Sequence, residues 1–141
     1  MTMTDILQVG TSRFLQAHAD LFFDEGTPQR TVTVVQTSGD PSRARRLAAL
    51  AAPDGYPVRI RGLTDGKVID ETRHVRSVRA TLSTATDWDA VVVAATEASL
   101  VISNTADAGY EPRPADESRA DPQAMSFPAK LALLLARRHA E

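Results

Sequence analysis

Short apolar runs recur along the chain and predict buried strands. Ile6–Val9 stops at Gly10, and Thr31–Val35 is β-branched throughout. Leu100–Ser103 is a third run of the same kind. Runs of this length and composition are typical of strands inside a sheet, and the β-branched run is expected to be a central one.

Segments with helical periodicity lie between these strands. Apolar residues at spacings of three and four predict one helix face within Arg13–Phe23, and Gly26–Pro28 ends that helix. The face comprises Phe14, Leu15, Ala17, His18, Leu21 and Phe22. Further helices are predicted over Ser42–Ala52, Trp88–Ala95 and Ser126–Arg138. Asp40 or Ser42 is expected to cap the second helix, and Thr86–Asp87 to cap the third.

A different pattern occupies the middle of the chain. Tyr56–Arg61 alternates apolar and polar residues, Asp65–Gly66 is a hairpin turn signal, and Val68–Val75 predicts the returning strand, with Val78 continuing the sheet. Asp107–Ala124 is polar and predicts a long exposed loop. The order of elements predicts an α/β fold, a doubly wound, mostly parallel sheet with a small antiparallel insert.

Composition narrows the function classes. The chain has 141 residues, one domain in size, and its net charge of −2 gives no electrostatic case for nucleic acid or an anionic membrane. It has no cysteine, and its three histidines lack metal-ligand spacing, so no metal site is expected. The first ten residues do not resemble a signal peptide, and no apolar run is long enough to span a membrane. We expect a soluble, cytoplasmic protein.

The first segment that bears chemistry is Gly10-Thr11-Ser12-Arg13-Phe14, between a strand and a helix. In a dinucleotide-binding fold this turn is tight, and its backbone approaches the pyrophosphate. Gly10 is placed for the tight turn, but Ser12 stands where the usual fingerprint has a second glycine, and the third glycine is absent. The motif alone is weak, and taken by itself it fits an ordinary strand-to-helix turn better.

The end of the second strand bears on the choice of cofactor. An acid there would bind the adenosine ribose and favour NAD, but the strand ends in Gln36, and Asp40 is the nearest acid. Arg43, Arg45 or Arg46 would instead meet a 2′-phosphate. A helix cap at Asp40 beside a solvated basic face is the third interpretation.

One further segment and two single residues are also candidates for the site. Ser103-Asn104-Thr105 follows a strand and would hold the nicotinamide ribose or amide, or form a simple turn. Lys130 is an anion contact if it faces the site, although a solvated lysine is the commoner case. His18 fits a partly buried structural histidine better than a ligand contact.

Five segments in order resemble the mannitol dehydrogenase family of polyol and uronate dehydrogenases, and more specifically its tagaturonate reductase (altronate oxidoreductase) branch. The resemblance runs from Ile6 to about Arg138. It rests on Leu7–Leu15, Val34–Thr37, Tyr56–Gly62, Ile102–Thr105 with Gly109-Tyr110, and Ser126–Leu131.

The resemblance implies a Rossmann-type, NAD-binding domain over residues 1–141. It implies that Gly10, Thr11, Ser12, Arg13 and Phe14 line the pyrophosphate, that Ser103, Asn104 and Thr105 lie near the nicotinamide, and that Gln36 and Asp40 belong to the cofactor site. The implied reaction is hydride transfer between NAD and a keto sugar acid of the tagaturonate or fructuronate type, or a ketose, without a metal.

The family's helical domain, with its catalytic lysine, asparagine and histidine, has no counterpart in these 141 residues. No catalytic residue is therefore expected here, Lys130 is expected only near the substrate, and the chain alone is expected to be inactive. The alternative is a non-catalytic nucleotide-binding or interaction module, a truncated relative of the family.

Overall fold

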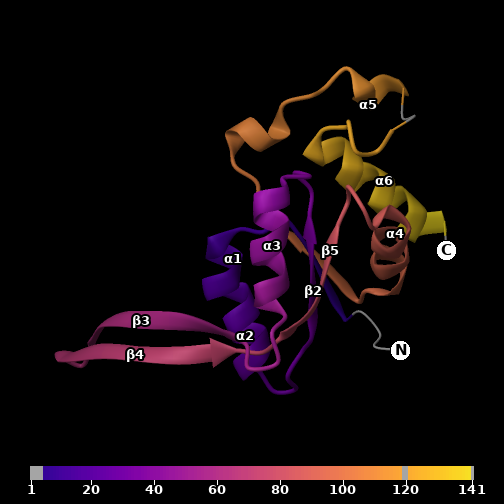
Figure 1. Ribbon diagram of the computed structural model, residues 1–141. Coiled ribbons are helices and arrows are strands. Elements are labelled where there is room, and N and C mark those ends of the chain that lie inside the picture. Colours follow the sequence, from indigo (N-terminus) through magenta and orange to yellow (C-terminus); the bar gives the residue numbers. More distant parts are fainter. Residues whose placement is uncertain (1–4, 119–120, 141) are drawn as a thin grey trace.

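The computed structural model describes residues 5–118 and 121–140. Four strands form a parallel sheet in the order β5-β2-β1-β6, and two form a separate antiparallel hairpin (Figure 1). The strands are β1 (Ile6–Val9), β2 (Val32–Gln36), β3 (Tyr56–Thr64), β4 (Lys67–Val75), β5 (Val78–Ser83) and β6 (Leu100–Ser103). The helices are α1 (Arg13–Ala17), α2 (Ala19–Glu25), α3 (Pro41–Leu50), α4 (Trp88–Glu97), α5 (Ala115–Ser118) and α6 (Phe127–Ala140). The predicted α/β architecture is confirmed.

Helices cover both faces of the sheet (Figure 1). Successive side chains of a strand point to opposite faces, so Leu7 and Val9 of β1 pack with Val91 of α4 and Leu134 of α6. Ile6 points the other way and packs in a second cluster with Leu47 of α3. All four residues of β1 are buried, which explains why the strand has no polar–apolar alternation.

The first predicted helix is broken at His18, and the prediction of a single apolar face was wrong. His18 has φ −122° and ψ −78°, outside the helical range, so α1 ends at Ala17 and α2 begins at Ala19. Leu15 and Leu21 are buried, but Phe14 and Phe22 are 59% and 63% exposed. His18 is also exposed, not partly buried, and stacks on Phe14 with ring centroids 4.4 Å apart.

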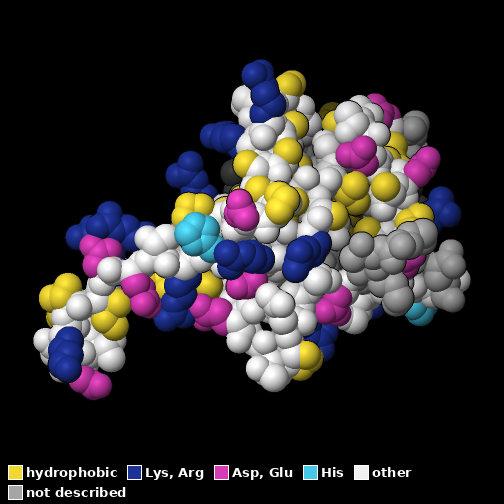
Figure 2. Space-filling model, turned by 60° about the horizontal axis from the view of Figure 1, so that its bottom comes forward, with side chains coloured by type: hydrophobic (Ala, Val, Ile, Leu, Met, Phe, Trp, Pro, Cys, Tyr) yellow, Lys and Arg dark blue, Asp and Glu magenta, His cyan; other side chains and the backbone are white. Residues whose placement is uncertain are grey.

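The hairpin β3–β4 stands away from the body of the protein, with charged side chains of both signs along it (Figures 1 and 2). Asp65 and Gly66 at its tip have φ 50° and 74°, as the predicted hairpin turn requires. Arg59 donates two hydrogen bonds to the Asp70 carboxylate across the strands. Val78 does not extend this hairpin, because β5 joins the main sheet, parallel to β2.

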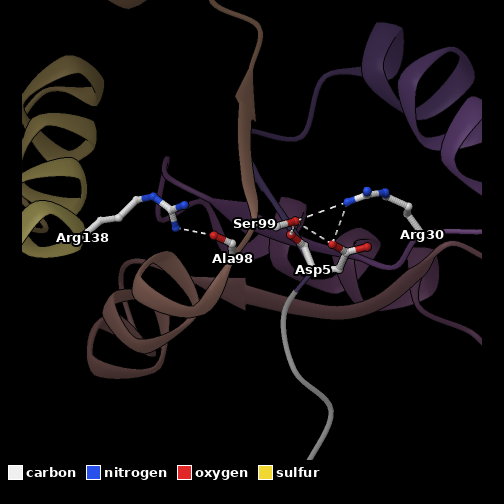
Figure 3. Close-up of polar contacts among 5 residues, drawn as sticks. All are labelled: Asp5, Arg30, Ala98, Ser99 and Arg138. Atoms are coloured by element: carbon white, nitrogen blue, oxygen red, sulfur yellow. Dashed lines mark hydrogen bonds and ion pairs between the residues drawn. The ribbon is translucent and has the colours of Figure 1, made fainter. Parts of the chain in front are cut away.

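Polar contacts tie the strands together at their amino ends (Figure 3). Asp5 precedes β1, and its carboxylate accepts hydrogen bonds from Arg30 at 3.1 Å and from the Ser99 hydroxyl at 2.7 Å. Arg138 of α6 donates to the carbonyl oxygens of Ala95 and Ala98 at the end of α4. These contacts connect the starts of β1, β2 and β6 with one another, and they fix α6 against the end of α4.

The segment after β6 is mostly exposed, as predicted, but it contains a 3-10 turn over Asp107–Tyr110 and the short helix α5. Asp87 occupies the N-cap position of α4, but its carboxylate accepts from the backbone N–H of Ser83 instead of capping the helix. None of the described helices is long and apolar enough to cross a membrane.

Candidate nucleotide-binding site

A groove of about 240 Å³ lies at the carboxyl ends of three neighbouring strands. Because β1 pairs with β2 on one side and with β6 on the other, the chain reverses direction across the sheet at β1. Ligands of doubly wound folds bind at such a switch point. The groove is lined by Thr11 and Ser12 after β1, Gln36, Thr37 and Ser38 at the end of β2, Arg43 of α3, and Asn104 after β6.

Gly10 forms the turn that leads from β1 into the groove. Its φ of +115° is one that residues with a side chain rarely adopt, whereas an added Cβ would meet no atom within 4 Å. Backbone conformation, and not crowding by the protein, is therefore what requires glycine here. Ser12 stands at the N-cap of α1, where its hydroxyl accepts a hydrogen bond from the Phe14 N–H at 3.2 Å.

Gln36 ends β2 as a buried side chain that organises the following loop. Its amide nitrogen donates to the Ser38 hydroxyl at 3.0 Å and to the Asp40 carbonyl at 2.9 Å. Its Oε1 has no hydrogen-bond partner among the residues that the structure describes. The sequence placed Gln36 in the cofactor site, and the structure places it in the wall of the groove.

Asp40 caps helix α3. One carboxylate oxygen accepts from the Ser42 N–H at 2.9 Å and from the Ser42 hydroxyl at 2.8 Å, and the other lies 3.6 Å from the Arg43 Nε. These bonds from Ser42, together with the nearby Arg43 charge, lower the pKa of Asp40. The capping interpretation is confirmed, and Asp40 is not among the residues that line the groove.

Helix α3 brings arginines to a second, larger groove beside the first. This groove has a volume of about 480 Å³. Arg13, Arg43 and Arg46 line it, together with Thr11, Gln16, Leu47 and Leu50. Arg43 lines both grooves, so it is the cation that connects them. The sequence indicated the basic helix but could not show which arginine faces the turn after β1.

Of the remaining candidate site residues, some line the groove and others lie outside it. Ser103 lies opposite Val9 in the sheet register, and Asn104 reaches the groove. Phe14 does not line it and stays on the surface. Within residues 5–118 and 121–140, no group of acidic or histidine side chains could hold a metal ion.

Lys130 is buried, so the interpretation as a solvated lysine was wrong. Only 3% of the residue is exposed, and its Nζ donates to the Thr37 carbonyl at 2.8 Å. Burial lowers the pKa of Lys130, and the nearby Arg113 lowers it further. The contact holds α6 against the loop after β2, directly behind one wall of the groove.

Known proteins resemble this chain in sequence or in fold. A search against models of protein families gave no match. An altronate oxidoreductase of Halalkalibacterium halodurans is 31% identical over 95% of this chain and 27% of its own length. One from Klebsiella pneumoniae is 34% identical over 95% of this chain and 28% of its own length. The chain therefore spans little more than a quarter of these curated relatives.

Solved structures show the same fold at low sequence identity. The mannitol 2-dehydrogenase of Pseudomonas fluorescens, solved as a ternary complex with NAD and D-mannitol, superposes with a TM-score of 0.76 and 17% identity. The match covers 99% of this chain and 31% of that one. A D-sorbitol dehydrogenase gives a TM-score of 0.75 at 17% identity, over 98% of this chain and 32% of that one.

The comparisons confirm the resemblance to the mannitol dehydrogenase family. The fold is the Rossmann type of its amino-terminal domain. Three of the segments on which the resemblance rests contribute residues to the groove, one after each of β1, β2 and β6. The segment around Lys130 supports the loop after β2, and Tyr56–Gly62 forms most of β3.

Proposed function

We propose that this chain binds NAD(H) and serves as the nucleotide-binding part of an oxidoreductase. The reaction interconverts a keto sugar acid of the tagaturonate or fructuronate type, or a ketose, with its hydroxy form. The observation that supports this proposal best is the polar groove at the switch point of the sheet, lined by the loops after β1, β2 and β6. NAD carries the hydride on its nicotinamide, and the chain's task is to hold it.

The residues of the groove suit a dinucleotide. The turn at Gly10 leads to Thr11 and Ser12, which line the groove, and Arg43 supplies positive charge for a pyrophosphate. The unpaired Oε1 of Gln36 is an acceptor that a ribose hydroxyl can satisfy after a small movement of the side chain. Asn104, across the groove, offers an amide for the nicotinamide end.

The substrate class follows from the relatives and not from this chain's own side chains. The curated relatives are altronate oxidoreductases, and a structural neighbour holds NAD and D-mannitol. Ketone reduction also needs a proton donor near the developing oxyanion. No side chain in this groove meets that need, and we assign Lys130 a supporting place beside the substrate region.

Calorimetry with NADH tests the binding proposal. We expect wild-type binding, and Arg43→Met is expected to weaken it about tenfold because one charge-assisted contact is lost. Arg45→Met is the matched control, since Arg45 lies on the same helix but lines neither groove. Equal effects of the two substitutions, or no binding by the wild type, would contradict the assignment.

An activity assay and a nucleotide-binding measurement together separate the two candidate functions. With NADH and tagaturonate, fructuronate or fructose, we expect no turnover from this chain alone, because the groove lacks a proton donor. Retained NADH binding supports the role as the nucleotide-binding part of an oxidoreductase. Loss of NADH binding with retained binding of another nucleotide would favour the alternative, a non-catalytic module.

A further inference from the structure

A buried carboxyl group lies between helix α2 and the sheet, below the candidate site. Asp20 is 0% exposed, and neither of its carboxyl oxygens has a hydrogen-bond partner among the described side chains and backbone. Its backbone carbonyl is held by the Ser77 hydroxyl at 2.7 Å, which fixes this part of α2 against the start of β5. A carboxyl group buried in this way normally has a partner, so its isolation calls for a functional account.

Gln8 connects this carboxyl group with the turn after β1. Its Nε2 donates to the Gly10 carbonyl at 3.2 Å, and the same side chain lies beside Asp20, whose pKa it affects. Gln8 is fully buried, and its Oε1 is a further acceptor without a partner in the described part of the chain. Gln8 therefore joins the Asp20 carboxyl group to the backbone of the candidate pyrophosphate turn.

The surroundings of Asp20 favour its neutral form. Burial raises the pKa of Asp20 to about 7, and the neighbouring polar side chains of Gln8 and Tyr56 offset only part of that effect. Tyr56 of β3 faces it, and its hydroxyl donates to the Gln16 carbonyl at 2.7 Å. Asp24 of the same helix adds negative charge near Tyr56, and Gln8 and Ser77 present neutral groups from the sheet side.

We propose that Asp20 is a positioning residue whose protonation state sets the conformation of the Gly10 turn through Gln8. In the neutral state the Gln8 amide holds the Gly10 carbonyl. A carboxylate is a stronger acceptor than a carbonyl, so ionised Asp20 draws the Gln8 amide toward itself and releases the turn. A proton on Asp20 removes the buried charge and converts one of its unpaired acceptors into a donor.

A consequence for ligand binding rests on the proposed function. If the held turn is the one that accepts a pyrophosphate, NADH binds the neutral form of Asp20 more tightly than the ionised form. Binding then weakens as pH rises through neutrality, by up to about tenfold between pH 6 and pH 8 for a pKa of about 7.

The first experiment needs no nucleotide. The carboxyl carbon of Asp20 and the amide signals of Gly10 and Thr11 are followed by NMR from pH 5 to pH 9. We expect all of them to move with one midpoint. In Gln8→Met, Asp20 should still titrate while the turn signals no longer follow. If the Gly10 and Thr11 signals of the wild type do not shift with the titration of Asp20, the proposal is wrong.

The second experiment measures NADH affinity at pH 6 and pH 8. Asp20→Asn should bind equally at both pH values, near the wild-type affinity at pH 6. His18→Gln is the matched control, because it removes an imidazole beside helix α1 and leaves Asp20 and Gln8 in place. It should keep the wild-type pH dependence.

The outcomes distinguish this inference from the proposed function. If Asp20→Asn keeps the pH dependence and His18→Gln loses it, the inference is wrong and NADH binding still stands. If NADH does not bind at any pH while Gly10 follows Asp20, the proposed function fails and the coupling stands. The titration of the wild type and Gln8→Met decides the question even if Asp20→Asn does not fold.

Discussion

The two ends of the parallel sheet differ in how their polar groups are satisfied. At the amino ends, Asp5, Arg30 and Ser99 bond one another, and Arg138 donates to the Ala98 carbonyl (Figure 3). Arg138 also donates to the Ala95 carbonyl of α4. Toward the carboxyl ends, Gln8 and Gln36 each keep a buried acceptor without a partner in the described ranges. Gly10 and Gly39 adopt positive φ there, at 115° and 66°.

This difference separates stability from binding. Satisfied polar groups hold strands and helices together but leave nothing for a ligand. Unpaired acceptors and unusual backbone conformations cost free energy in the empty protein, and such features cluster where proteins bind or react. We expect substitutions at the amino ends to change stability alone, and those at the carboxyl ends to change ligand affinity as well.

The largest effect is expected at Asp20. A carboxyl group with a raised pKa stabilises the fold fully below its unfolded value near 3.8, and this contribution is lost as pH rises toward about 7. Asp20→Asn avoids the buried charge, so it should be more stable than the wild type by on the order of 3 kcal/mol at pH 8, and similar near pH 4. Urea unfolding at both pH values measures this. Equal stability at pH 8 would contradict the burial of an ionisable Asp20.

The second largest effect is expected for Arg138→Met, which should lower the free energy of unfolding. It leaves the carbonyls of Ala95 and Ala98 without their donor, at a cost of about 2 kcal/mol. Arg137→Met, at the neighbouring exposed position, should cost little. Urea unfolding gives the stabilities and calorimetry the NADH affinity, which neither variant should change. A weakened affinity in Arg138→Met would break the separation between the two ends.

Gly10→Ala tests the turn at the carboxyl end. The positive φ of Gly10 should cost about 1–2 kcal/mol once a side chain is present, and NADH affinity should fall with it. Gly62→Ala is the control, because its added Cβ also meets no atom within 4 Å and its φ is not positive. Thermal unfolding and NADH titration on both variants measure the contrast. Unchanged affinity in Gly10→Ala would remove the turn from the site.

The smallest effect is expected at Asp40. Asp40→Ala should cost about 1 kcal/mol as a lost helix cap. It also frees Arg43 from its ion pair, so the ratio of NADPH to NADH affinity should rise. Titrations with both cofactors measure the ratio, and adding Arg43→Met should abolish the change. A ratio that falls would instead favour direct contact of Asp40 with the ribose.

The sequence predicted the elements that local pattern controls. The short apolar runs of β1, β2 and β6 and the Asp65–Gly66 turn carry their signal within a few residues, and the structure has them where expected. The resemblance to the mannitol dehydrogenase family also needed only the order of short segments. Residues after β1, β2 and β6 were predicted as the site because the carboxyl ends of parallel strands meet at one edge.

The tertiary structure decided which face each side chain takes. The break at His18 turned Phe14 outward and Asp20 inward, although their periodicity and charge predict the opposite. Packing of α6 on the loop after β2 buried Lys130, and helix capping engaged Asp40 away from the groove. Burial and partners depend on contacts between residues distant along the chain. Sequence pattern therefore located the site, while packing alone determined which of its polar groups are satisfied and which remain free to bind.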